Sequence, residues 1–170
     1  MHETQAQEPS PNKKLDFKKN IFTLAFFILL VVGGGITIGI TTVPGPWYAN
    51  LQKPFFNPPN WIFGPVWTAL YLMIAFVGWR TWQCRDSATL KRLWAVQLFL
   101  NFFWSPVFFG AQMPGLAFCI IVCLMLVVLV FIRTAWRQDH LSAQLFVPYA
   151  AWLGFASLLN LAIFYLNMAS

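Results

Sequence analysis

The chain has 170 residues, of which 59% are hydrophobic, 18% are aromatic and only 9% are charged, and its net charge is +6. Soluble domains carry about 25% charged residues, so this composition excludes a soluble globular protein and indicates a membrane protein. The positive charge favours anionic lipid as a partner and gives no reason to expect nucleic acid.

Five apolar segments are long enough to cross a hydrocarbon core of about 30 Å, which needs roughly 20 residues of helix. We therefore expect a polar, basic and disordered tail over residues 1–20, followed by a single all-α domain over residues 21–170 that forms a bundle of five transmembrane helices. The predicted spans are Ile21 to Thr42, Ile62 to Trp79, Leu93 to Phe109, Leu116 to Ile132, and Leu145 to Asn167.

Lysine and arginine residues predict the orientation, because basic residues in short loops are retained on the cytoplasmic side. Of the 11 Lys and Arg residues, only Lys53 falls in a loop of the opposite side. The rest lie before the first span or in the second and fourth connections. This distribution predicts a cytoplasmic N-terminus and an external C-terminus.

Polar residues recur on one face of the third span, where Gln97, Asn101 and Ser105 are four residues apart and Trp104 lies beside them. Hydrocarbon penalises unsatisfied polar groups, so such a face turns away from lipid. The second and fifth spans carry comparable groups, and the three helices are expected to share an interior. The residues concerned are Trp67, Tyr71, Tyr149, Trp152, Ala156 and Asn160.

Other features of the spans leave alternatives open. The fourth span has no polar stripe and is expected to face lipid or another subunit. Gly35 and Gly39 have the spacing of close helix contacts, either within the bundle or in a dimer. Cys119 and Cys123 share a helix face and are expected to be small lipid-facing residues, with a thiolate metal or haem site as the alternative.

No ionisable residue lies well inside a span, which argues against a proton pump. Both histidines fall outside the spans, so neither a histidine-ligated haem within the bundle nor a Ser-His-Asp hydrolase is expected. We predict no metal site and no required cofactor.

The first connection reads "WYANLQKPFFNPPNWIFGPVW" from Trp47 to Trp67. It is too rich in proline for a helix and too apolar to stay disordered in water. We expect it to fold over the outer mouth of the bundle as a lid, with an aromatic belt at the membrane surface as the alternative. The predicted lid residues are Trp47, Lys53, Phe55 and Phe56.

Four segments, "WYANLQKP", "PPNWIFGPVWTALY", "LNFFWSPVFFG" and "VPYAAWLGFASLLN", resemble the signature segments of the tryptophan-rich sensory protein family, which includes the mitochondrial translocator protein or peripheral benzodiazepine receptor. The resemblance implies a five-helix bundle, often dimeric. Its cavity beneath the first loop would bind porphyrins such as protoporphyrin IX and haem, benzodiazepine-type ligands and, in some members, cholesterol.

Together, the stripes and the resemblance predict a ligand-binding set of eight residues. Lys53 is expected either to pair with a porphyrin propionate or to be a solvated loop lysine. Sterol or another lipid is a further candidate partner, although Leu161 and Tyr165 replace the Tyr and Arg of the animal cholesterol pattern. The ligand-binding set is Tyr48, Trp67, Tyr71, Asn101, Trp104, Ser105, Trp152 and Ala156.

The function expected first is a tetrapyrrole receptor or sensor that modulates porphyrin metabolism or a stress response, with porphyrin as ligand and a homodimer as the assembly. The alternatives are a transporter of porphyrin or lipid and an enzyme for light-dependent breakdown of protoporphyrin IX, in which Trp67 and Trp152 would pass electrons. A bacterial plasma membrane is favoured over a bacterial or mitochondrial outer membrane.

Overall fold

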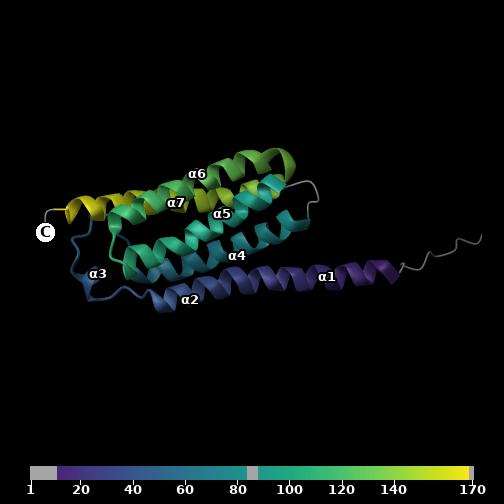
Figure 1. Cartoon of the computed structure of the whole chain (residues 1–170), viewed down its shortest axis with the longest axis horizontal. Coiled ribbons are helices and arrows are strands. Elements are labelled where there is room, and N and C mark those ends of the chain that lie inside the picture. The colour runs from purple at the N-terminus through teal and green to yellow at the C-terminus, as the bar shows by residue number, and fades with distance from the viewer. Residues whose placement is uncertain (1–10, 84–87, 169–170) are drawn as a thin grey trace, which may run out of the picture.

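The structure, a computed structural model, describes residues 11–83 and 88–168, with side chains from residue 20 onward. The described residues form helices and connections without a strand (Figure 1). The chain is a multi-pass integral membrane protein, and all five predicted spans are confirmed. They are Asn20–Thr41, Asn60–Gln83, Ala88–Gly110, Pro114–Gln138 and His140–Leu166.

The first span joins two α-helices through one π-helical turn. Helix α1 covers Pro11–Ile28, the turn covers Leu29–Gly33, and α2 covers Gly34–Thr41. Residues 11–20, expected to be disordered, are thus helical; the rest of the predicted tail lies outside the described residues. Because no Gly or Pro occurs between residues 12 and 32, nothing in the sequence stops the span from extending as a helix toward its N-terminus.

The remaining helices follow in chain order. The first loop holds the short helix α3 and leads through a single 3-10 turn into the second span. The third span ends in another π-helical turn, over Pro106–Gly110. The α-helices are α3 (Pro46–Asn50), α4 (Phe63–Gln83), α5 (Ala88–Ser105), α6 (Pro114–Gln138) and α7 (His140–Leu166).

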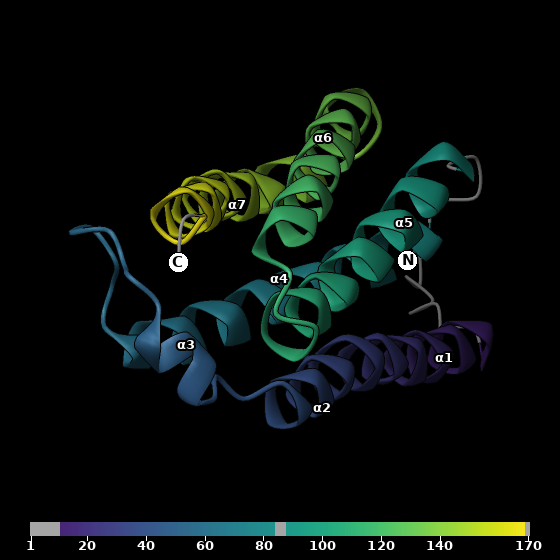
Figure 2. The ribbon, with the colours of Figure 1, turned by 60° about the vertical axis from the view of Figure 1, so that its left-hand side comes forward.

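The five spans pack side by side, with α3 at one end of the bundle (Figures 1 and 2). Helix α1 packs on α4, and α6 packs on α5 and α7. The fourth span was expected to face lipid or another subunit, but one of its faces is part of the core; Cys119 and Cys123 lie on its exposed side. The buried residues of α6 are Ala117, Ile121, Leu124, Val128, Phe131 and Ala135.

Close approach at Gly78 fixes the contact between α4 and α5. A Cβ atom at Gly78 would lie 2.4 Å from the ring of Trp94, so any larger residue would displace this indole. The Trp94 Nε1 atom donates to the carbonyl oxygen of Ile74 at 2.9 Å, and Phe27 of α1 packs edge-on against the same ring. This end of the bundle is therefore filled by side chains.

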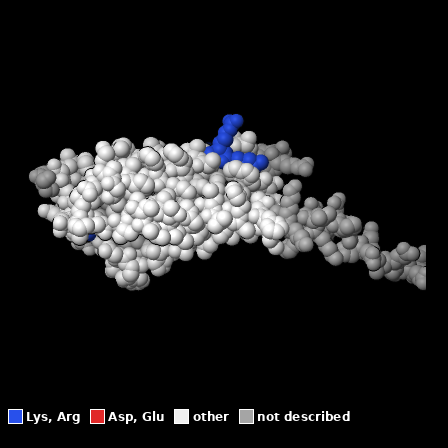
Figure 3. Space-filling view, turned by 60° about the horizontal axis from the view of Figure 1, so that its bottom comes forward, with Lys and Arg blue, Asp and Glu red and all other residues white. Residues whose placement is uncertain are grey.

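Basic side chains gather at the end opposite α3, where they are visible on the face shown in Figure 3. Arg80, Lys91 and the pair Arg133 and Arg137 lie near helix ends that meet there, whereas Lys53 follows α3 at the other end. The predicted separation of basic residues along the bundle is thus present in the fold.

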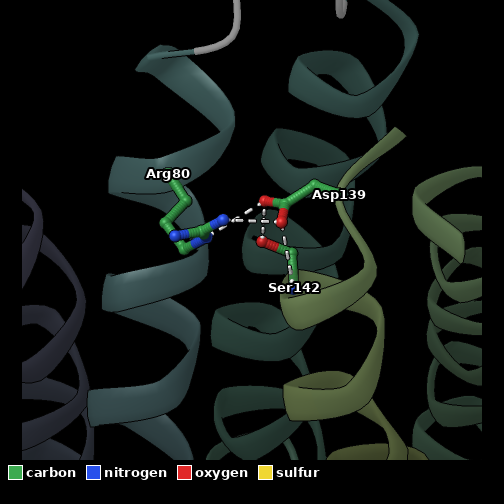
Figure 4. Close-up of polar contacts among 3 residues, drawn as sticks. All are labelled: Arg80, Asp139 and Ser142. Carbon is green, nitrogen blue, oxygen red and sulfur yellow. Dashed lines mark hydrogen bonds and ion pairs between the residues drawn. The ribbon is translucent and has the colours of Figure 1, made fainter. Parts of the chain in front are cut away.

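An ion pair ties α4 to the turn between α6 and α7 (Figure 4). Arg80 donates from Nη2 to Asp139 Oδ1 at 2.8 Å and from Nε to Oδ2 at 3.1 Å. Asp139 is the N-cap of α7 and also accepts hydrogen bonds from the backbone N–H and the hydroxyl of Ser142. Burial alone would raise the pKa of Asp139, but the Arg80 and Ser142 hydrogen bonds and the Arg80 charge outweigh it and hold this pKa below its ordinary value.

The Asp139→Asn variant should lower the free energy of unfolding at pH 7 by about 1–3 kcal/mol, because it removes a partly buried ion pair. The pKa of Asp139 is lower in the folded than in the unfolded state. The ion pair therefore contributes fully to the free energy of unfolding above about pH 4, and this contribution is lost as the pH falls further. Thermal unfolding in detergent at pH 7 and pH 3 measures the difference. A Lys91→Gln control should change little; an Asp139→Asn effect that stays constant down to pH 3 would contradict this role.

Candidate functional site

A cavity of about 670 Å³ lies at the α3 end of the bundle, bordered by α2, α4, α5 and α7. The structure brings all eight residues of the predicted ligand-binding set to its wall, although they come from four separate parts of the chain. Their role in binding a ligand stays a prediction. The eight are Tyr48, Trp67, Tyr71, Asn101, Trp104, Ser105, Trp152 and Ala156.

Aromatic faces make up much of the cavity wall. The rings of Trp67 and Tyr71 are 5.4 Å apart on successive turns of α4, tilted by 34°. Trp104 of α5 stacks on Phe108 of the following π-helical turn, with ring centres 5.3 Å apart. Because rings paired in this way are fixed in orientation, they offer a flat apolar ligand preformed surfaces.

Helix α2 forms a wall that the polar stripes did not predict. Gly35 and Gly39 line the cavity, and a Cβ atom at Gly35 would lie 2.3 Å from the ring of Tyr71. Gly35 therefore serves close packing inside the bundle, the first of the two expected roles. Beyond it, the hydroxyls of Thr42 and Ser105 are hydrogen bonded at 2.7 Å and join α2 to α5. The four-residue spacing of the two glycines was the one signal in the sequence.

A buried chain of hydrogen bonds joins α5 and α7 beside the cavity. The Tyr149 hydroxyl donates to Gln97 Oε1 at 3.1 Å and accepts from Asn101 Nδ2 at 2.8 Å. Asn101 is only 4% exposed, yet its Oδ1 atom has no hydrogen-bond donor among the residues that the structure describes. Tyr149 and Gln97 thus hold a cavity-lining amide that keeps one unused polar atom.

Trp104 is held by a second chain of hydrogen bonds. Its Nε1 atom donates to Asn160 Oδ1 at 3.1 Å, and Asn160 Nδ2 donates to the carbonyl oxygen of Pro114 at 2.8 Å. Asn160 also lines the cavity. It was placed in the polar stripe of the fifth span but was not included among the predicted binding residues.

The predicted lid does not cover the cavity as expected. None of Trp47, Lys53, Phe55 and Phe56 lines it; Phe55 is fully exposed. Instead the two ends of the loop line the wall, through Val43, Pro44, Tyr48 and Asn60.

The middle of the loop is held elsewhere by the end of α7. The Asn167 side chain accepts from the Gln52 backbone N–H and donates to the Gln52 carbonyl oxygen, both at 3.0 Å. Phe56 packs edge-on near Phe155 of α7 at 6.5 Å. Since Pro54, Pro58 and Pro59 have no backbone N–H and disfavour helix, this stretch is an irregular loop with one turn, in which the Asn57 N–H donates to the Pro54 carbonyl oxygen at 3.0 Å.

Lys53 has a structural position that neither expected role describes. Its Nζ atom donates to the carbonyl oxygens of Tyr48, Ala49 and Leu51 at 2.7, 3.2 and 3.2 Å. It also lies 4.7 Å from the centre of the Tyr48 ring. The lysine therefore caps the C-terminal end of α3 and fixes Tyr48, the one loop aromatic that lines the cavity; burial raises the pKa of that phenol.

Comparison with known proteins gives a consistent result. The model of the TspO/MBR family matches residues 26–166. A tryptophan-rich protein TspO from Archaeoglobus fulgidus is 40% identical over 152 residues, which cover 87% of this chain and 99% of that protein. A tryptophan-rich sensory protein from Cereibacter sphaeroides is 34% identical, covering 86% and 92%. The human translocator protein is 41% identical over 125 residues, covering 69% and 72%.

Lys53→Met should loosen α3 without changing the transmembrane helices, because it removes three charge-assisted hydrogen bonds to backbone carbonyls. We expect hydrogen exchange across residues 46–53 to become about fivefold faster, which corresponds to about 1 kcal/mol of local stability. Gln52→Ala is the matched control, since Gln52 contacts Asn167 through main-chain atoms. Unchanged exchange in Lys53→Met would show that the lysine does not hold the helix.

Proposed function

The chain belongs to the TspO/MBR family, and we propose that it is a membrane receptor or sensor whose cavity binds a tetrapyrrole such as protoporphyrin IX or haem. Binding would modulate porphyrin metabolism or a stress response. The names of the relatives from Cereibacter sphaeroides and human, a tryptophan-rich sensory protein and a translocator protein, are compatible with a ligand-responsive membrane protein.

The size and surface of the cavity support a flat ligand of this class. Its volume of about 670 Å³ lies within the range of about 300–1,000 Å³ that is typical of small-molecule sites. Trp67 and Trp152 offer indole faces from α4 and α7. The described lining residues carry no formal charge, so we expect the apolar macrocycle to enter and its carboxylates to stay near the loop end, where water is accessible.

The observation that carries the proposal is the unused amide atom of Asn101. Leaving a buried polar atom unsatisfied costs about 1–3 kcal/mol, and a ligand that supplies the missing hydrogen bond removes this cost. Reversing the amides of both Gln97 and Asn101 preserves the hydrogen bonds through Tyr149 and leaves an N–H donor unused in place of the oxygen. In either orientation one buried polar atom of Asn101, a residue that lines the cavity, has no hydrogen-bond partner among the described residues.

A receptor is favoured over a transporter because the cavity is confined to one end. Toward the opposite end, Trp94, Phe131 and Phe146 are buried and fill the core. A transporter would need access from both membrane faces. The corresponding test is uptake into liposomes: binding without uptake supports the receptor, and uptake that depends on Asn101 would favour transport.

We also propose a cytoplasmic N-terminus in a bacterial plasma membrane. The support is the position of Arg80, Lys91, Arg133 and Arg137 near the helix ends opposite α3, together with the rule that basic residues are retained in the cytoplasm. Reporter fusions at the C-terminus test it: alkaline phosphatase should be active there and green fluorescent protein should stay dark.

Titration with protoporphyrin IX should quench the intrinsic tryptophan fluorescence of the purified protein in a saturable way. Asn101→Ala and Trp152→Phe should each raise Kd by about tenfold, equivalent to about 1.4 kcal/mol. Asn101→Ala removes the side-chain amide, and Trp152→Phe leaves a smaller aromatic surface on the cavity wall.

Trp61→Phe is the matched control, since Trp61 is exposed and does not line the cavity; its Kd should equal that of the wild type. Linear quenching that is the same in all four proteins would mean nonspecific partitioning and would overturn the proposed function.

A further inference from the structure

Helix α6 carries two arginines at the end of the bundle opposite the cavity. Arg133 and Arg137 are one helical turn apart and both are exposed. Together with Trp136, which is 50% exposed, they border a shallow, open groove whose lining residues all belong to α6. The floor of this groove is apolar and is formed by Leu129, Val130 and Ile132.

The position of the arginines along α6 places them at the depth of lipid headgroups. The helix begins at Pro114, and Arg133 follows 19 residues later. At about 1.5 Å per residue this is about 28 Å, close to the thickness of the hydrocarbon core. When Pro114 lies at one boundary of the core, Arg133 reaches the opposite boundary, and Leu129 and Val130 remain beside the acyl chains.

Neither arginine is neutralised by a carboxylate within the described part of the chain. Asp139 follows α6 directly, but both of its oxygens are engaged by Arg80 and Ser142, which belong to other helices (Figure 4). The Arg80–Asp139 contact is the one ion pair found among residues with described side chains. Arg133 and Arg137 therefore lie one turn apart on an exposed face of α6 with no carboxylate partner among the described residues, so an external anion could pair with both.

We propose that this groove is a binding site for an anionic phospholipid. The guanidinium forks of Arg133 and Arg137 hold the phosphate group, for which their paired N–H donors are suited. The Trp136 indole lies at the headgroup level, where such rings are favoured, and an acyl chain follows Leu129 and Val130 along α6. This site is separate from the cavity and does not depend on the proposed tetrapyrrole.

The proposal is tested by native mass spectrometry of the delipidated protein. Phosphatidylglycerol or phosphatidylcholine is added, and the amount of lipid that the protein retains is measured. The wild type should retain phosphatidylglycerol in preference to phosphatidylcholine. The double variant Arg133→Gln/Arg137→Gln should retain it at least about fivefold more weakly, as expected when two basic contacts are lost. Arg133→Lys/Arg137→Lys keeps the charge but loses the forks, so its retention should fall between the two.

Lys91→Gln/Arg92→Gln is the matched control, because it removes the same charge at the same end of the bundle but from α5. It should retain phosphatidylglycerol like the wild type. Equal losses in the two Gln double variants would mean diffuse attraction and would overturn the site, as would a wild type without preference. Displacement of the lipid by millimolar inorganic phosphate would overturn the lipid as occupant. Unchanged helical circular dichroism in each variant separates loss of binding from loss of fold.

Discussion

Hydrocarbon offers no hydrogen-bond partner, so each polar side chain within a transmembrane bundle must find its partner inside the protein. This requirement sets how α5 and α7 face each other. Tyr149 bonds to Gln97 and Asn101 on successive turns of α5, and farther along the same helices Trp104 bonds to Asn160. Turning either helix by one residue, about 100°, would move these amides toward lipid. The two chains of hydrogen bonds therefore fix the rotation of both helices, and with it the direction of the α5 and α7 side chains on the cavity wall.

The cavity wall combines large and small residues from α2, α4 and α7. Trp67 and Trp152 supply broad rings, whereas Ala156 and Gly39 leave space. At Gly35 the backbone of α2 approaches so closely that the Tyr71 ring occupies the position of a side chain. Flat walls and one unused amide atom are consequently built into the fold. A ligand would meet a site that is already formed, which limits the ordering cost of binding.

Two simple rules were enough to predict the spans and the inward faces of the second, third and fifth: the length of apolar runs, and the turning of polar stripes away from lipid. The inclusion of Tyr48, which lies in the first loop, came from the family resemblance. The two rules could not predict the wall formed by α2, because a glycine has no side chain whose polarity could be read. Nor could they place Lys53 and Phe55. The lysine bonds to backbone carbonyls, and the phenylalanine points outward because Gln52 is fastened to Asn167, 115 residues away in the chain. Contacts of this kind depend on the path of the loop and have no local pattern.

The central claim, that the cavity at the α3 end of the bundle is the ligand site, is tested most directly by an experimental structure of the protein in lipid nanodiscs with protoporphyrin IX. The account predicts the macrocycle between Trp67 and Trp152, with a polar contact to the side-chain amide of Asn101 and the propionates toward the first loop. A macrocycle lying on the lipid-facing surface or against Phe55, with the cavity empty, would contradict it.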